Sequence, residues 1–212
     1  MSETLLKHTA TTMAIMVAFS LVGTFFLAST YLATKAPIEA SEAAAKMKLF
    51  EQVLPVSEHD NDLLNDFVEV PAGGELNNRT VTKAYTARLA SVATAVILEA
   101  TARDGYSGDI KLLIAVRQDG SLSGVRVIAH KETPGLGDYI DIAKDNWIKS
   151  FNNLSFTSRS SEQWKVKKDG GQFDYMAGAT ITPRAVVKAT HKVLAYVEAN
   201  QQLLFAQHKI KF

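Results

Sequence analysis

Residues 110–129 read IKLLIAVRQDGSLSGVRVIA, and this stretch decides which kind of sheet the chain can form. Its first half, residues 110–117, is mostly apolar, and its second half, residues 122–129, again carries strand-forming side chains. Asp119 and Gly120 stand between the halves as a tight-turn pair. Two strand-like runs joined by such a pair are typical of a β-hairpin. The sequence therefore predicts two neighbouring antiparallel strands.

The segments around this hairpin mix short strands with helices. Further strands are expected at residues 68–71, 81–89, 92–100 and, as an edge strand, 164–168. Apolar residues recur at helical spacing in residues 138–151, which predicts a helix. Strands and helices do not alternate in the manner of a parallel sheet. The predicted fold class is therefore α+β, with antiparallel strands in a single mixed α/β domain.

The last predicted element is a helix from Pro183 to about Gln207. Thr182 suits its N-cap and Pro183 its first turn. Apolar residues spaced three or four positions apart lie on one side of a helix, which is then buried. The expected buried stripe consists of Val186, Val187, Thr190, Val193, Leu194 and Val197.

The N-terminal region has the composition of a membrane anchor. Residues 9–34 carry no charged side chain. Because a helix needs about 20 such residues to cross a bilayer, we expect an anchor over residues 1–35 with its span at about residues 10–33. A cleaved signal peptide is the alternative, but its apolar region is usually about 7–15 residues long and ends in a small-residue cleavage site. Lys7 and Lys35 flank the span on both sides, so charge alone says little about its orientation.

Residues 36–80 are expected to connect the anchor to the globular domain. Residues 38–54 favour an amphipathic helix that Pro55 stops. Residues 56–79 are rich in acidic residues and Asn and contain Gly, which suggests a surface excursion. The predicted globular domain comprises residues 81–212.

The overall composition argues against several classes of function. The 212 residues include 23 Lys and Arg and 22 Asp and Glu, for a net charge of +1. Nucleic-acid partners favour a strongly basic face, so no nucleic acid is expected as a partner. The absence of cysteine excludes disulfides, iron–sulfur clusters and thiolate zinc sites within the chain. The histidines His59, His130, His191 and His208 lie in unlike segments and do not suggest a metal site.

Residues 174–180, DYMAGAT, precede the final predicted helix. The small residues at 177–179 let a bulky group approach the backbone, and Thr180 offers a hydroxyl near the start of a long helix. Helix N-termini favour phosphate, because their amides are unpaired and the helix dipole is positive there. The segment therefore resembles a hydroxyl-bearing phosphate site, although an ordinary helix cap is the simpler interpretation.

A second segment, residues 130–137, reads HKETPGLG. Pro134 and two glycines exclude regular structure, so we expect a rigid loop with exposed amides. Such a loop can approach a planar ligand and offer Glu132 and Thr133 as hydrogen-bonding groups. A tight connection between a strand and a helix is the alternative, for which Pro and Gly suffice.

These two segments, together with Gly105–Ile110, resemble the motifs of the FMN-binding domain family. Asp174–Thr180 is similar to that family's flavinylation signal, in which an Asp and a small residue precede Gly-Ala-Thr. Ala177 departs mildly, since Ser or Thr is frequent there. With an anchor of this type, the whole chain resembles the G-subunit family of the Rnf (Rsx) ion-translocating electron-transport complex.

The resemblance implies that a flavin transferase uses FAD to place FMN on Thr180 as a covalent phosphoester. Asp174, Gly178 and Ala179 then belong to the sequence that this enzyme reads. Near the isoalloxazine ring the family's arrangement implies four residues: Glu132, Thr133, Leu136 and Gly137.

The resemblance also implies a role and a location. The chain is expected to relay electrons within a complex that couples ferredoxin/NAD redox chemistry to ion translocation, and not to be a complete enzyme alone. It is expected to be a single-pass protein of a bacterial inner membrane, in contact with lipid and with other subunits. The FMN domain is expected on the periplasmic side.

Three alternatives stay open from the sequence. The first is the C subunit of a sodium-translocating NADH:quinone reductase, whose family shares both motifs but is typically longer. The second is a cofactor-free membrane-tethered assembly module, and the third is a lone flavin reductase.

Two further groups of residues have a structural and a functional interpretation. Trp147 and Trp164 are interpreted as core residues, with stacking on a ring as the alternative. Lys165, Lys167 and Lys168 are interpreted as a solvated edge strand. Contact with the flavin phosphate or with an acidic partner is the alternative for these lysines.

Overall fold

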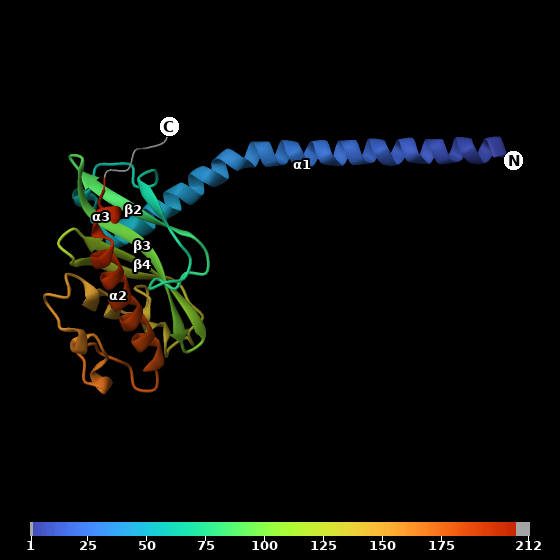
Figure 1. Ribbon diagram of the computed structural model, residues 1–212. Coiled ribbons are helices and arrows are strands. Elements are labelled where there is room, and N and C mark those ends of the chain that lie inside the picture. The colour runs from blue at the N-terminus through green and yellow to red at the C-terminus, as the bar shows by residue number, and fades with distance from the viewer. Residues whose placement is uncertain (1, 207–212) are drawn as a thin grey trace. The chain divides into compact units, whose positions relative to one another are not determined.

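The computed structural model describes residues 2–206 and divides into two compact units, one ending at Lys46 and one beginning at Met47 (Figure 1). Helix α1 (Ser2–Val53) forms the first unit and continues to the start of the second. From Lys7 to Val53 it is long and apolar enough to cross a membrane, with a mean hydropathy of 1.9 in its most apolar window. The expected candidate transmembrane helix is therefore present.

Pro37 lies inside α1, whereas one helix was expected before it and a separate helix after it. A proline in a helix removes one backbone hydrogen bond and disfavours helical backbone before it, which is why a break is predicted. The residues after Pro37 are rich in Ala, Glu, Lys and Leu, which have high helix propensity, and the helix continues through them. It ends at Val53, two residues before Pro55, as expected.

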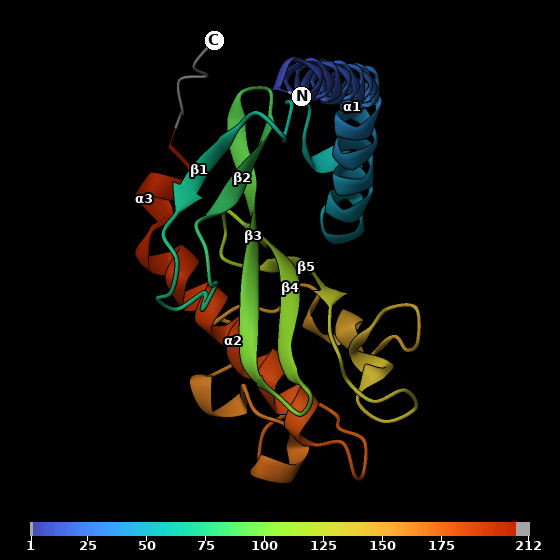
Figure 2. The same ribbon diagram turned by 90° about the vertical axis from the view of Figure 1, so that its right-hand side faces the viewer.

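The second unit is built on a five-stranded sheet in the order β1-β2-β3-β4-β5 (Figure 2). All neighbouring strands are antiparallel. The strands are β1 (Phe67–Val70), β2 (Thr82–Leu89), β3 (Val92–Gly105), β4 (Gly108–Arg117) and β5 (Leu122–Ala129). The predicted α+β class and its antiparallel strands are confirmed.

The hairpin that residues 110–129 predicted is the β4–β5 pair, in which Ile114 lies opposite Val125. Its turn is closed by a hydrogen bond of 2.8 Å from Arg117 N to Ser121 O. Gly120 has a φ of +81°, which glycine adopts without strain. Turn chemistry and apolar pattern therefore agree at this position.

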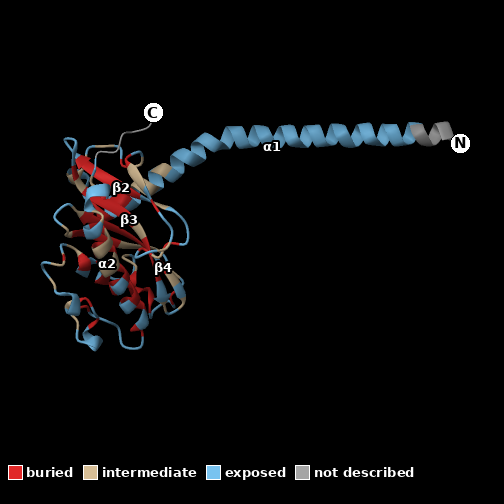
Figure 3. Cartoon of the chain, viewed as in Figure 1, coloured by how far each residue is buried: buried red, intermediate tan, exposed pale blue. Residues whose placement is uncertain are grey.

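Both faces of the sheet are covered by apolar side chains, and the strands are largely buried (Figure 3). One face packs against helix α2 (Ile181–Ala199), through residues such as Leu98 and Ile114. The other face packs against the last turn of α1. There a Cβ on Gly124 would lie 2.8 Å from Val53 O, so this contact needs a glycine.

The predicted buried stripe of the final helix is confirmed, because all six of its residues are buried. The helix itself is interrupted, since α2 ends at Ala199 and a short α3 (Gln201–Leu204) follows. Asn200 stands between them, and its side-chain Nδ2 donates to Tyr196 O at 2.8 Å. The expected end at Gln207 lies outside the described residues, as does His208.

Residues 138–151 do not form one helix, which corrects the prediction. Two short 3₁₀ helices stand there instead, η2 (Asp138–Ile140) and η3 (Trp147–Phe151). Two aspartates between them bind the backbone two residues on: Asp141 Oδ1 accepts from Ala143 N at 2.9 Å, and Asp145 Oδ1 accepts from Trp147 N at 2.7 Å. Such local bonds compete with helical ones.

The expected edge strand at 164–168 is also wrong. The chain turns back on itself through η4 (Ser161–Gln163) and η5 (Lys167–Asp169), and Val166 makes only a single bridge to Phe173. Trp164 and Val166 lie in the core, and so does Trp147, as expected for the tryptophans.

Residues 56–80 are part of the globular unit, whereas a surface excursion was expected. They contain η1 (Val56–Glu58) and β1, which pairs with β2. Leu63 and Leu76 are fully buried. The short strand expected at residues 68–71 is present as β1, whereas the burial of Leu63 and Leu76 could not be read from a segment rich in acidic residues and Asn.

Candidate functional site

A cavity of about 180 Å³ lies where the loop after β5 meets the start of α2. The β3–β4 turn contributes one wall through Tyr106. The cavity is lined by Tyr106, Glu132, Thr133, Leu136, Gly137, Gly178, Ala179, Thr180, Ile181 and Thr182. Three segments that are distant in sequence therefore share one site.

Glu132 lies at the centre of the hydrogen bonds around this cavity and is 4% exposed. Its Oε2 accepts from the Thr182 hydroxyl at 2.6 Å, and its Oε1 accepts from Ser107 N at 3.1 Å. Its own backbone N donates to His130 Nδ1 at 3.1 Å. A buried carboxylate needs such donors. Glu132 thus joins the β5 loop to α2 and to the β3–β4 turn.

Two glycines leave room for the Glu132 side chain. A Cβ on Gly137 would lie 2.8 Å from both Glu132 Oε2 and Thr182 Oγ1, and one on Gly105 would lie 2.9 Å from Glu132 Oε1. Gly137 has a φ of −89°, which any residue adopts. Its lack of a side chain is therefore a matter of space at the carboxylate and not of backbone strain.

The loop of residues 133–137 is held by its own backbone. Thr133 O accepts from Leu136 N and from Gly137 N, both at 3.1 Å. Asp138 Oδ1 accepts from Gly135 N at 2.7 Å. The expected rigid loop is therefore present and leaves Thr133 and Leu136 exposed. The amides of Gly135, Leu136 and Gly137 were expected to be exposed, but they are bound within the loop, which corrects that part of the prediction.

Thr180 and Thr182 have different environments. Thr180 occupies the N-cap position of α2, and its side chain makes no capping hydrogen bond. Thr182 lies inside the first turn, is 1% exposed, and donates its hydroxyl to Glu132. The expectation that Thr182 caps the helix is wrong, because Glu132 is its partner. Of the two hydroxyls, that of Thr180 is the one that lines the cavity without a hydrogen bond to the rest of residues 2–206.

The segment from Asp174 to Gly178 is positioned by aromatic residues. Trp147 Nε1 donates to Asp174 O at 2.8 Å, and Met176 N donates to the Tyr139 hydroxyl at 3.4 Å. Burial raises the pKa of Tyr139 to about 12, so this hydroxyl stays protonated. Gly178 has a φ of +86°, a left-handed conformation in which a side chain is strained.

The structure brings together seven of the eight residues expected at the site. Asp174 does not line the cavity, and its carboxylate forms an exposed ion pair with Lys167. Tyr106, Ile181 and Thr182 line the cavity but were not singled out as site residues. Tyr106 lies within the motif Gly105–Ile110, which was the available signal.

Comparison with known proteins defines the class to which this fold and site belong. Residues 105–195 match the FMN-binding domain family, and this range contains all the cavity residues. Residues 1–53, a range that includes α1, match the family described as the RnfG N-terminal region. The second unit thus contains an FMN-binding domain.

Relatives of known name give the particular family. The chain is 47% identical over 188 residues to the G subunit of an ion-translocating oxidoreductase complex from Pseudomonas aeruginosa (strain UCBPP-PA14), covering 89% of this chain and 88% of the relative. It is 42% identical over 193 residues to the protein of the same name from Vibrio atlanticus (strain LGP32), covering 91% and 92%. The protein of that name from Pseudoalteromonas atlantica is 40% identical over 188 residues, covering 89% and 87%. The chain belongs to the family of these G subunits.

The residues around the cavity fit a flavin phosphate. The Thr180 hydroxyl, which has no hydrogen-bond partner within residues 2–206, stands at the start of α2, a helix of 19 residues whose first amides lack intrahelical acceptors. Tyr106, Leu136 and Ile181 are 69%, 47% and 44% exposed, and add apolar surface for a planar ring. Each side-chain oxygen of Glu132 already accepts a hydrogen bond, one from the Thr182 hydroxyl and one from Ser107 N.

Proposed function

We propose that FMN is attached covalently through its phosphate to Thr180, and that the chain relays electrons within an Rnf-type ion-translocating complex. The observation that carries the proposal is the Thr180 hydroxyl, which lines the cavity and makes no capping hydrogen bond. The neighbouring Thr182 hydroxyl is engaged by Glu132 at 2.6 Å, which supports Thr180 as the attachment residue.

Attachment by a flavin transferase takes FAD as the donor. Thr180 Oγ1 forms a bond to the phosphorus of the FMN half, and the bond between the two phosphates of FAD breaks. AMP leaves with that electron pair, and the hydroxyl proton is released. The positive end of the α2 dipole and its unpaired amides stabilise the phosphoester, which still carries one negative charge.

The other site residues hold the geometry of this linkage. FMN, when bound, supplies the electron-transfer chemistry, because redox reactions belong to the cofactor. Glu132 keeps the β5 loop against α2, so that Thr133, Leu136 and Gly137 stay beside the start of the helix. Gly178 and Ala179 keep the approach to Thr180 free of large side chains, and Asp174 belongs to the segment that the transferase reads.

Helix α1 anchors the domain in the membrane. Its apolar side chains from Met13 to Leu32 are exposed within the described residues, which suits contact with lipid. We place the anchor in a bacterial inner membrane with the FMN domain on the periplasmic side, since a covalent link retains flavin where free flavin is scarce. The relatives are named as subunits of a complex, so the partners of this chain are other subunits of such a complex.

The test is the intact mass of the full chain after denaturation, from cells that also express a flavin transferase. We expect the mass of one FMN less one water, mapped to the peptide that contains Thr180. Thr180→Ala is expected to remove the added mass, whereas Thr182→Ala is expected to keep it. An unmodified wild-type chain would refute covalent attachment and favour a cofactor-free assembly module, and a modified Thr182 would refute the choice of residue.

A further inference from the structure

A groove of about 540 Å³ runs along the exposed side of α2, apart from the cavity at Thr180. The apolar residues that border it, Trp164, Val166 and Val187, belong to the buried core. The 164–166 segment forms one wall and α2 the other. The proposed flavin function makes no use of this groove.

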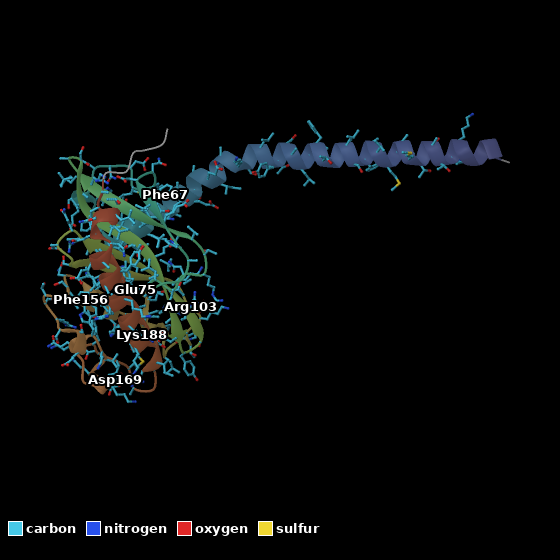
Figure 4. All side chains as sticks on the ribbon, in the orientation of Figure 1. Phe67, Glu75, Arg103, Phe156, Asp169 and Lys188 are labelled. Atoms are coloured by element: carbon cyan, nitrogen blue, oxygen red, sulfur yellow. The ribbon has the colours of Figure 1, made fainter. Side chains whose placement is uncertain are left out.

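Positive side chains surround the groove. Helix α2 contributes Arg184, Lys188 and Lys192 at intervals of four residues, which places them on one face. Lys165 adds a fourth cation from the opposite wall. The one carboxylate among the lining residues belongs to Asp169, and Figure 4 shows Asp169 and Lys188 at the same end of the globular unit.

The acidic residues nearby neutralise only part of this charge. Asp169 binds Arg184 through two contacts of 2.5 Å, and Asp104 binds Lys188 at 2.6 Å. Within residues 2–206, Lys165 and Lys192 form no ion pair. The chain as a whole has a net charge of only +1, so the positive groove is a local feature and not a consequence of composition.

Two buried polar atoms beside the groove have no hydrogen-bond partner among the described residues. Trp164 is 4% exposed, and its Nε1 has no hydrogen-bond partner. His191, also a lining residue, has a buried Nε2 without a partner. Native proteins rarely leave buried donors unpaired, because each costs about 1–3 kcal/mol. Both atoms are closed off from solvent, so the accessible lining of the groove is that of its cationic side chains, and its attraction for a partner is electrostatic.

We propose that this groove docks an acidic segment of another subunit of the complex. Carboxylates of the segment meet Lys165, Lys188 and Lys192. The inference rests on the proposed function, because it requires a partner subunit. Of the two alternatives that the sequence left open for Lys165, the flavin phosphate and an acidic partner, the proposal favours the acidic partner.

A protein segment fits the groove better than a small anion does. The rim is exposed: the Arg184 and Lys188 side chains are 42% and 62% accessible, so the charges are solvated and are not gathered in an enclosed chamber. Solvated charges of one sign are typical of the polar rim of a protein interface, where they select a partner of opposite charge. Arg184 follows Thr180 by about one turn of α2, so the groove begins about one helical turn from the proposed attachment residue.

The test uses the membrane complex purified through an affinity tag on the full chain. Lys188→Glu combined with Lys192→Glu reverses two charges of the groove, and Lys144→Glu combined with Lys149→Glu reverses two exposed charges elsewhere as a matched control. We expect the groove variant to retain other subunits about tenfold less well or worse, and the control to retain them as the wild type does. Flavin fluorescence of the denatured chain is expected to be equal in all three, which shows that each one folds and is modified.

Equal retention of subunits by the groove variant and the control overturns the proposal. If charge reversal prevents folding, Lys188→Gln combined with Lys192→Gln removes the two charges without reversing them. Retention of other subunits is then expected to fall several-fold, and the fall is expected to be larger at low salt. A photo-crosslinking residue at position 192 in the assembled complex is expected to join an acidic stretch of one partner subunit. Crosslinks to lipid alone, or none, contradict docking, and a wild-type chain that retains no subunit refutes the proposed function itself.

Discussion

Replacing Thr182 by valine tests the hydrogen bond that joins the two halves of the site. The Thr182 hydroxyl donates to Glu132 Oε2 at 2.6 Å, and the residues are 1% and 4% exposed. Valine has nearly the shape of threonine, so Thr182→Val keeps the packing and removes only the donor. Glu132 Oε1 keeps its bond from Ser107 N, so half of the carboxylate is left without a donor.

The expected loss of stability follows from this geometry. A hydrogen bond to a charged group contributes about 1.5–3 kcal/mol, and an unsatisfied buried carboxylate oxygen places Thr182→Val in the upper half of this range. We therefore expect the free energy of unfolding to fall by about 2–3 kcal/mol. For a domain of about 150–250 residues this corresponds to a melting temperature lower by about 4–12 °C.

The assay is thermal unfolding of the full chain in detergent, followed by tryptophan fluorescence. Thr182→Ser keeps the hydroxyl and loses one methyl group, for which about 1 kcal/mol is expected. Thr180→Val removes a hydroxyl that makes no capping bond, and a change within about 0.5 kcal/mol is expected. The reasoning is refuted if Thr182→Val melts at the temperature of Thr182→Ser or above it.

Two further predictions concern the packing of the sheet and the response to pH. Gly124→Ala is expected to lower the free energy of unfolding in urea by about 1–3 kcal/mol, because its Cβ would lie 2.8 Å from Val53 O and 2.9 Å from Val53 Cα. Gly23→Ala is the neutral control, because Gly23 has open space around it. Equal urea midpoints for the two variants would contradict the expected clash at Val53. Burial lowers the pKa of His191 below its ordinary value of about 6.5, so the folded state binds fewer protons than the unfolded state. The stability that a neutral His191 contributes is therefore complete above about pH 6.5 and is lost as the pH falls below that value. Between about pH 7.5 and 5.5, the melting temperature is expected to fall less steeply for His191→Gln than for the wild type. Identical slopes for the two proteins would exclude His191 as a cause of the pH dependence.

Short-range patterns explain which elements the sequence predicted well. The β4–β5 hairpin depends on Asp119 and Gly120 and on the apolar runs beside them, and all of this information lies within 20 neighbouring residues. The buried stripe of α2 is likewise a matter of spacing. Residues 138–151 have helical spacing too, but the side chains of Asp141 and Asp145 bind the backbone locally and divide the segment.

The candidate site was predicted through its motifs, and its contacts were not. The resemblance named seven residues that now line one cavity, although nothing in their spacing shows that residues 132 and 182 meet. The partner of Thr182 was missed because a threonine near a helix start is usually a cap. Asp174 was grouped with the cavity residues because it shares their motif, yet its side chain points to Lys167.

The sequence by itself determined the apolar N-terminal helix, the central hairpin, the buried side of the last helix and the family to which the flavin motifs belong. These features depend on composition and on patterns that repeat within a few residues. Only the tertiary structure decided that the Thr182 hydroxyl is engaged while that of Thr180 is not, and that Lys165 faces Lys188 and Lys192 across a groove. Those relations join positions far apart in the chain, and they arise only when α2 packs across the sheet, because burial and charge at a site depend on neighbours in space.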